Sequence, residues 1–259
     1  MSADDDELEL PGAIGAVRVG ETVRKTAGPW TTTVHALLRF VRAEGFGLAP
    51  EPLGVDEEGR EVLAWIEGDP AGRPWPRLLL GPDGVVELAS MVRKYHDVVR
   101  AFDPGEDARW RSGPARLGPG EIALHGDFAP WNTVWRDSSL VGVIDWDMAE
   151  PGLPIVDLAF LALHLVPLRS DARAALVGFA SPPDRRSRLA TLCDAYGGLE
   201  PAEVLEAVAS FHERDRRRTV GWGREGREPW ATFLARGELA TIADDTKWLD
   251  AHRDELSGS

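Results

Sequence analysis

The sequence predicts an α+β fold of two lobes, a small β-rich N-terminal lobe and a larger, mainly helical C-terminal lobe. Short strand-like segments precede residue 66, and helical periodicity dominates after about residue 85. Between them, residues 67–76 contain two glycines and three prolines, which is typical of a crossover. The expected divisions are a disordered acidic tail at residues 1–10, a first lobe at 11–69 and a second lobe at 70–259.

In the first lobe, residues 16–25 form a predicted β-hairpin with its turn at Gly20 and Glu21. A helix follows, for which Thr31 to Thr33 offer caps and Gly45 an end. Its apolar residues recur at the spacing of one helix face. The remaining predicted elements of this lobe are strands at residues 51–55 and 61–66.

In the second lobe, Asp83 can cap a helix that runs from about Val85 to Phe102. A short strand is predicted at residues 122–124, and the chain is mostly helical from Ile155 onward. The other expected features are a hairpin at residues 133–144 and helix breaks near residues 181–183, 197–198 and 221–223.

Composition excludes several classes of protein. The net charge of −14 argues against a nucleic-acid partner and favours a cationic ligand. No apolar run is long enough to cross a bilayer, and the acidic N-terminus does not read as a secretory signal, so we expect a cytoplasmic protein without membrane contact. Cys193 is the single cysteine, which excludes an internal disulfide bond.

The candidate chemistry lies between residues 125 and 147. Phosphoryl transfer to a hydroxyl group needs a carboxylate that accepts the proton and oxygen ligands that hold Mg²⁺. Asp127 and Asn132 have the spacing found in the catalytic loop of protein kinases, and Asp145 follows the predicted hairpin. This hairpin carries the chain out and back, so Asn132 and Asp145 are expected to converge on one metal ion.

The whole run resembles a known family. His-Gly-Asp-x-x-x-x-Asn at residues 125–132, Ile-Asp-Trp-Asp at 144–147 and Asp-Leu-Ala at 157–159 resemble the aminoglycoside phosphotransferase and choline kinase superfamily. The match is strong over residues 122–163, and the order of elements agrees over most of the chain. The resemblance implies a protein-kinase-like fold, with the first lobe binding nucleotide and the second carrying catalysis and substrate binding.

The resemblance also implies the cofactors ATP and Mg²⁺ and a role for each residue that matches the motif. Asp127 would be the catalytic base that orients the acceptor hydroxyl. Asn132 and Asp145 would be metal ligands, and Asp147 would support the metal directly or through water.

Other residues take their expected roles from the same resemblance. His125 and Asp157 would be structural, with Asp157 bracing the backbone of the catalytic loop. Lys25 stands where the family places the lysine that contacts the nucleotide phosphates. The carbonyl of Ala64 and the amide of Ile66 would bind adenine.

Two features of the first lobe depart from the family pattern. The family pairs its lysine with a helical glutamate, but here His35 lies near that position and Glu44 stands at the far end of the helix. Whether His35 replaces the glutamate is left open. Gly12, Gly15 and Gly20 do not form a G-x-G-x-x-G loop, so a plain turn and a phosphate contact remain alternatives.

The expected function is therefore ATP-dependent transfer of the γ-phosphoryl group to a hydroxyl of a small molecule. An aminoglycoside-like or other antibiotic is the leading acceptor, for resistance or for self-protection. One alternative is a metabolic kinase that acts on choline, homoserine or a sugar. Another is a non-catalytic immunity or binding protein with the kinase fold. The sequence leaves open the acceptor, the choice of ATP or GTP and the oligomeric state.

Overall fold

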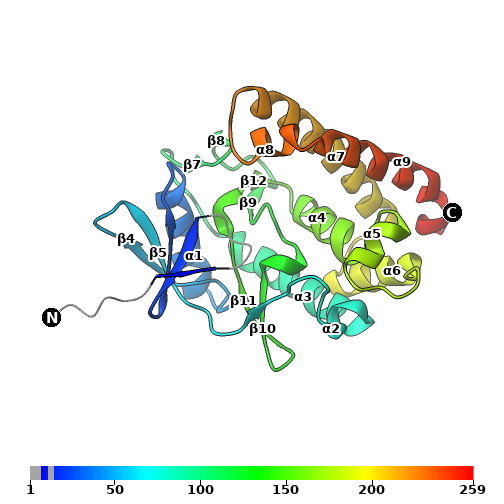
Figure 1. Ribbon diagram of the computed structural model, residues 1–259, viewed down its shortest axis with the longest axis horizontal. Coiled ribbons are helices and arrows are strands. Elements are labelled where there is room, and N and C mark those ends of the chain that lie inside the picture. Colours follow the sequence, from blue (N-terminus) through cyan, green and yellow to red (C-terminus); the bar gives the residue numbers. More distant parts are fainter. Residues whose placement is uncertain (1–6, 11–14, 259) are drawn as a thin grey trace. The chain divides into compact units, whose positions relative to one another are not determined.

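The computed structural model describes residues 7–10 and 15–258 of the protein (Figure 1). The chain divides into two compact units that are interleaved in sequence. The predicted boundary near residue 70 lies close to the first division, but the chain later returns twice to unit 1. Unit 1 consists of Met1–Ala71, Lys94–Asp127 and Trp131–Pro154, and unit 2 of Gly72–Arg93, Phe128–Pro130 and Ile155–Ser259.

Unit 1 begins with a five-stranded antiparallel sheet of the order β1-β2-β3-β5-β4. It confirms the predicted hairpin and both later strands. The sheet begins within the segment expected to be a disordered tail, because β1 pairs with β2; residues 1–6 of that segment lie outside the described residues. The strands are β1 (Leu8–Glu9), β2 (Ala16–Val19), β3 (Thr22–Thr26), β4 (Pro52–Val55) and β5 (Arg60–Ala64).

The predicted helix after the hairpin is α1 (Thr31–Ala43), whose apolar face is buried as expected. The predicted threonine caps are wrong. The Thr31 hydroxyl accepts a hydrogen bond from the Gly28 amide at 2.9 Å, and the Thr33 hydroxyl accepts one from the Arg109 amide at 3.0 Å. Both hydroxyls therefore hold neighbouring loops against the helix instead of satisfying the first amides of α1.

Short strands in unit 1 bring the motif residues together. The predicted hairpin at residues 133–144 is confirmed, and its turn uses positive φ angles at Asp137 and Ser138. The strand at residues 122–124 is confirmed as β9, which pairs with β12. The short strands are β6 (Asp69–Pro70), β7 (Arg109–Trp110), β8 (Gly113–Pro114), β9 (Ile122–Leu124), β10 (Thr133–Arg136), β11 (Ser139–Val143) and β12 (Glu150–Gly152).

The second part of the chain is mainly helical, as predicted. The helix expected from Val85 is α3, but it begins at Pro82, so Asp83 lies in its first turn and not at its cap. None of the helices that the structure describes has the length and apolar character needed to span a membrane. The helices are α2 (Arg77–Leu80), α3 (Pro82–Val99), α4 (Ile155–Leu165), α5 (Asp171–Leu176), α6 (Arg185–Tyr196), α7 (Pro201–Arg224), α8 (Trp230–Ala235) and α9 (Glu238–Ser257).

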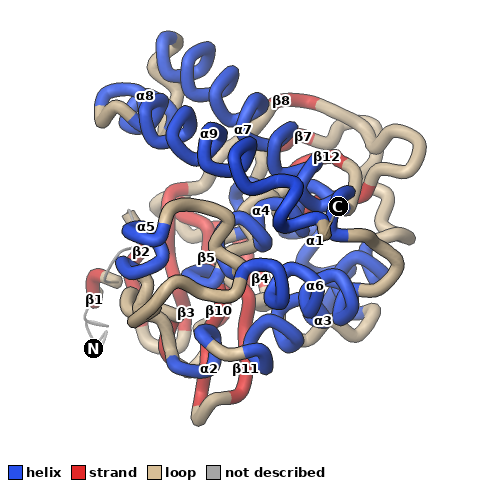
Figure 2. Tube along the Cα trace, turned by 90° about the vertical axis from the view of Figure 1, so that its right-hand side faces the viewer, coloured by secondary structure: helices blue, strands red, loops and turns tan. Residues whose placement is uncertain are grey.

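The glycines near the end of α7 do not break the helix, contrary to the prediction for residues 221–223. Helix α7 continues to Arg224, and within unit 2 it packs against both α8 and α9 (Figure 2). A Cβ atom on Gly223 would lie 2.8 Å from the carbonyl oxygen of Trp230 in α8. Gly223 thus allows close approach of two helices. The breaks near residues 181–183 and 197–198 are confirmed.

Candidate active site

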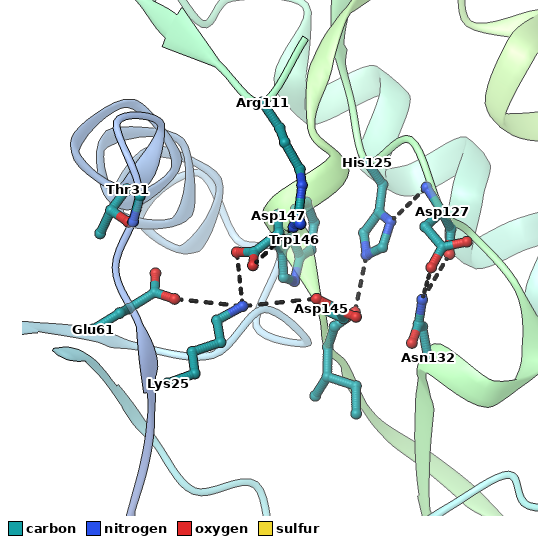
Figure 3. A network of polar contacts seen from close by, with 12 residues as sticks. Lys25, Thr31, Glu61, Arg111, His125, Asp127, Asn132, Asp145, Trp146 and Asp147 are labelled. Atoms are coloured by element: carbon teal, nitrogen blue, oxygen red, sulfur yellow. Dashed lines mark hydrogen bonds and ion pairs between the residues drawn. The ribbon is translucent and has the colours of Figure 1, made fainter. Parts of the chain in front are cut away.

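Asp127 and Asn132 form the first part of the site, both in unit 1 (Figure 3). Asp127 follows β9, and Asn132 ends a short 3₁₀ turn, Pro130–Asn132. The side-chain amide of Asn132 donates to the Asp127 carbonyl oxygen at 2.9 Å and to its carboxylate oxygen Oδ2 at 2.7 Å. The carboxylate is thus held in one orientation. The side-chain nitrogen of Asn132 is already used in these two hydrogen bonds, and the side-chain oxygen is the atom suited to bind a cation.

His125 joins the loop of Asp127 to the strand end that precedes Asp145. Its Nε2 donates to the carbonyl oxygen of Ile144 at 3.1 Å, and its Nδ1 accepts from the Asp127 amide at 3.2 Å. The amide of Ile144 in turn donates to the carbonyl oxygen of Asn132 at 2.9 Å. The buried imidazole therefore connects backbone segments, and these bonds favour the structural role expected of it.

Gly126 explains why glycine stands between His125 and Asp127. Its φ of 82° lies in the left-handed region, and a Cβ atom there would be only 2.0 Å from the Met148 carbonyl oxygen. Only glycine accommodates both conditions. The close approach packs the segment after Asp145 directly against the loop that carries Asp127.

Asp145 occupies a strained backbone position at the end of the hairpin. Its φ and ψ are 61° and 65°, in the left-handed region that residues with a Cβ seldom adopt. The next residue, Trp146, is buried, and its Nε1 donates to the Val143 carbonyl oxygen at 2.9 Å. This anchor fixes the turn, and the Asp145 side chain remains 55% exposed. An exposed carboxylate on a fixed turn is well placed to meet a ligand.

Lys25 lies among three carboxylates (Figure 3). Its Nζ is 2.7 Å from Asp147 Oδ1, 3.4 Å from Glu61 Oε2 and 3.7 Å from Asp145 Oδ1. Burial alone would lower the pKa of Lys25, but attraction to Asp147, Asp145 and Glu61 outweighs it and raises that pKa above its usual value. The ammonium group is therefore charged at neutral pH.

Glu61 was not identified from the sequence. It lies on β5, directly opposite Lys25 on β3, and its Oε1 is 2.9 Å from Nε2 of His35 on α1. Glu44 is exposed at the end of α1. The available signal was the pairing of the two predicted strands, since opposite residues in a ladder share a face.

Arg111 was also missed, because nothing in its local sequence marks it. It follows β7, and its guanidinium stacks over the ring of Trp30 at 4.8 Å. Its Nη1 lies 3.6 Å from Asp147 Oδ2. Asp147 is consequently shared by two cations, Lys25 and Arg111 (Figure 3).

The oxygen ligands at the site fit Mg²⁺ brought by a nucleotide. The described residues contain no group of three or more His, Cys, Asp or Glu side chains placed to hold a metal by themselves. Mg²⁺ is usually held by one or two carboxylates together with substrate phosphates. The exposed Asp145 carboxylate and the Asn132 amide oxygen meet this requirement. Asp147 already contacts two cations, which suits the supporting role expected of it better than direct coordination.

The remaining predicted site residues keep their expected roles as predictions. The Ala64 amide donates to the Glu51 carbonyl oxygen at 2.8 Å, whereas the amide of Ile66 donates no hydrogen bond within the described chain. Asp157 is fully buried in the first turn of α4. Gly20 forms the turn between β2 and β3, and Gly12 lies outside the described residues.

Comparison with known proteins places this site in a family. The sequence profile of the phosphotransferase enzyme family matches residues 106–190, which include Asp127, Asn132 and Asp145. The trifolitoxin immunity protein of Rhizobium leguminosarum bv. trifolii is 36% identical over 272 aligned residues, covering 98% of this chain and 99% of that protein. The chain belongs to the phosphotransferase enzyme family. Family membership supports phosphotransferase activity and the interpretation of the chain as a small-molecule kinase.

Solved structures of phosphotransferases share the fold. A choline/ethanolamine kinase family protein from Mesorhizobium loti is 19% identical, with a TM-score of 0.56 over 95% of this chain and 91% of that chain. The amicoumacin kinase hAmiN, solved with AMP-PNP and Ca²⁺, is 10% identical, with a TM-score of 0.61 over 94% of this chain and 90% of that chain. At these identities the likeness shows the fold, and it confirms the predicted kinase-like α+β class.

Proposed function

We propose that this phosphotransferase uses ATP and Mg²⁺ to transfer the γ-phosphoryl group to a hydroxyl group of an antibiotic-like toxin. The observation that carries the proposal is the hydrogen bond between Asn132 and the Asp127 carboxylate, which presents a base of fixed orientation next to a metal ligand. Such positioning supplies most of the catalysis in phosphoryl transfer.

Each residue has a defined part in the proposed reaction. Asp127 orients the acceptor hydroxyl and receives its proton as the new oxygen–phosphorus bond forms and the bond to the β-phosphate oxygen breaks. Asn132 and Asp145 hold Mg²⁺, with Asp147 in support, and Lys25 binds the phosphates. Mg²⁺, when bound, neutralises the charge that develops on the phosphate oxygens. Ala64 and Ile66 bind adenine through their backbone.

The acceptor is inferred from the relatives and the charge of the chain. The immunity protein, which aligns over nearly the whole chain, favours a role in protection against a toxin. The net charge of −14 favours a cationic acceptor. A reaction that consumes ATP also fits a cytoplasmic location. A metabolic acceptor such as choline is supported only by a shared fold.

A second candidate is an immunity protein that binds its toxin without phosphoryl transfer. The immunity protein relative favours this alternative as well, because its name specifies protection and not a reaction. The two candidates differ in whether Mg²⁺-ATP is bound and turned over.

The deciding experiment combines thermal unfolding with and without Mg²⁺-ATP and an assay of ADP release. The acceptors to test are aminoglycosides, nucleoside antibiotics, peptide toxins, choline, homoserine and sugars. We expect stabilisation by Mg²⁺-ATP and acceptor-dependent ADP release that is lost in Asp127→Asn. If the nucleotide has no effect and no acceptor yields ADP, the kinase proposal is wrong and the binding protein is favoured.

A further inference from the structure

Lys25, the lysine expected to bind phosphate, pairs with a strand glutamate and not with the helical glutamate of the family pattern. Lys25 and Glu61 occupy opposite positions on the paired strands β3 and β5. Glu61 is 1% exposed, and its Oε2 lies 3.4 Å from the Lys25 ammonium. Its other carboxylate oxygen, Oε1, is 2.9 Å from Nε2 of His35.

This arrangement is costly for the fold. A buried carboxylate needs hydrogen bonds and a counter-charge. Within the described chain the Glu61 side chain has two partners, Lys25 and His35, and its Oε2 makes an ion pair but no hydrogen bond. Buried ion pairs often add little net stability. A role in stability alone therefore explains Glu61 poorly, whereas a role in holding Lys25 explains both contacts.

The three carboxylates around Lys25 are not equivalent. Asp145 and Asp147 lie on the segment after the hairpin, where the metal and phosphates are expected. Glu61 instead belongs to the same sheet as Lys25. When phosphates attract the ammonium group away from Asp147, the contact with Glu61 can persist, because the ladder between β3 and β5 holds the two backbones together.

We propose that Glu61, braced by His35, is a positioning residue that holds Lys25 for the nucleotide phosphates. The inference rests on the proposed kinase function and deepens it. In protein kinases the corresponding ion pair joins a strand lysine to a helix glutamate and depends on the position of that helix. Here the carboxylate comes from the neighbouring strand, and the helix contributes His35 as its brace.

Calorimetric titration with Mg²⁺-AMP-PNP tests the proposal without a known acceptor. Glu61→Gln keeps the shape of the side chain and removes its charge. We expect its Kd to rise by about 10- to 100-fold, as for a lost charged contact. Glu58→Gln makes the same change at an exposed position in the turn before β5, and its Kd should equal that of the wild type.

Exchanging the two residues provides a second, independent variant. In His35→Glu/Glu61→His the carboxylate comes from α1 and the imidazole from β5, so the charge near Lys25 is restored. We expect this double variant to bind Mg²⁺-AMP-PNP more tightly than Glu61→Gln by at least about fivefold, since the ion pair is rebuilt. If Glu61→Gln does not fold, the Kd of the double variant is compared with that of His35→Leu, which lacks the brace. His35→Leu should bind Mg²⁺-AMP-PNP more weakly than the wild type, and the double variant should bind it more tightly than His35→Leu.

The possible outcomes separate this inference from the proposed function. If the wild type binds Mg²⁺-AMP-PNP and Glu61→Gln binds within about twofold of it, the positioning role is wrong and the kinase function stands. A lower Tm with unchanged Kd would likewise assign Glu61 to stability alone. If the wild type itself does not bind the nucleotide, the proposed function fails and the positioning role fails with it.

Discussion

The side-chain amide of Asn132 lies 2.7 Å from the carboxylate of Asp127, so the expected metal ligand also orients the expected base. Both residues lie in the loop after β9, and His125 ties this loop to the strand end before Asp145. The two functions of the site are therefore coupled through one hydrogen bond. This coupling makes different predictions for substitutions of the two residues.

Asp127→Asn should abolish turnover and leave nucleotide binding intact. The amide cannot accept the proton of the acceptor hydroxyl, so we expect kcat to fall by at least about 100-fold. The Kd for Mg²⁺-AMP-PNP should change little, because Asp127 is not assigned to the nucleotide. Asn132→Ala removes both the orienting bond and the ligand, so it should impair kcat and nucleotide binding together. Steady-state kinetics and calorimetry on the two variants check this contrast.

Asp145→Asn should sharply weaken Mg²⁺-dependent nucleotide binding. Asparagine tolerates the left-handed backbone of this position, so the substitution removes charge with little added strain. Asp137→Asn is the matched control, because Asp137 also has a positive φ but lies in the turn between β10 and β11. We expect the Kd of AMP-PNP with Mg²⁺ to rise at least about tenfold in the first variant only. Equal binding by both variants would disprove the assignment of Asp145 to the metal.

Much of the fold could be predicted because local patterns determine it. The hairpin at residues 16–25, the apolar face of α1 and the hairpin at residues 133–144 follow from alternation, helical spacing and turn residues. The errors occurred where tertiary contacts override local preference. Thr31 and Thr33 bond to other segments instead of capping α1, and Gly223 meets α8 instead of ending α7.

The residues of the site likewise divide into those that the sequence could predict and those that it could not. The residues from His125 to Asp147 could be named from one continuous motif, since their spacing in sequence is short and the hairpin brings them together. Glu61 and Arg111 could not, because their roles depend on contacts with residues far away in sequence. Glu61 needs the register of β3 against β5, which propensity alone does not specify.

Arg188→Leu should destabilise the protein strongly. Arg188 is buried on α6 and donates hydrogen bonds to the carbonyl oxygens of Leu79, Leu80, Gly81 and Leu165. Burial lowers its pKa to about 10, so it remains charged at pH 7, and no carboxylate among the described residues pairs with it. Leucine would remove the donor to these carbonyl groups, of which those of Leu79 and Leu165 accept buried hydrogen bonds, at a cost of about 3 kcal/mol. Arg186→Leu, at an exposed position of α6, should change the free energy of unfolding by less than about 0.5 kcal/mol in denaturant titrations.

His212 should make the stability of the protein depend on pH in mildly acidic solution. Burial, together with the charge of Arg169, lowers the pKa of His212 from 6.5 to about 4. Its Nδ1 lies 3.2 Å from the hydroxyl of Thr246, which itself donates to the Ile242 carbonyl oxygen. Nδ1 of the neutral imidazole therefore donates to the Thr246 hydroxyl.

Between pH 6.5 and pH 4 the unfolded chain binds a proton at His212 that the folded chain does not. Above pH 6.5 the contribution of His212 to the free energy of unfolding should therefore be constant. As the pH drops from 6.5 to 4, this contribution should lower the free energy of unfolding by up to about 3 kcal/mol. His212→Asn keeps a donor for Thr246 but does not titrate. Denaturant unfolding of both proteins at several pH values should show the advantage of the wild type shrinking toward pH 4; a constant difference would contradict the neutral, buried histidine.

Alanine at Gly221 and at Gly223 should have opposite effects, although both glycines lie in the last turns of α7. A Cβ atom on Gly221 would meet nothing within 4 Å, whereas one on Gly223 would lie 2.8 Å from the Trp230 carbonyl oxygen and 3.0 Å from Leu234 Cβ. Gly221→Ala should stabilise the protein by about 0.5–1 kcal/mol, because alanine loses less backbone entropy in a helix. Gly223→Ala should destabilise it by about 1–3 kcal/mol, because α8 must move away. Thermal unfolding checks the pair, and stabilisation by both substitutions would show that α8 does not need a glycine at residue 223.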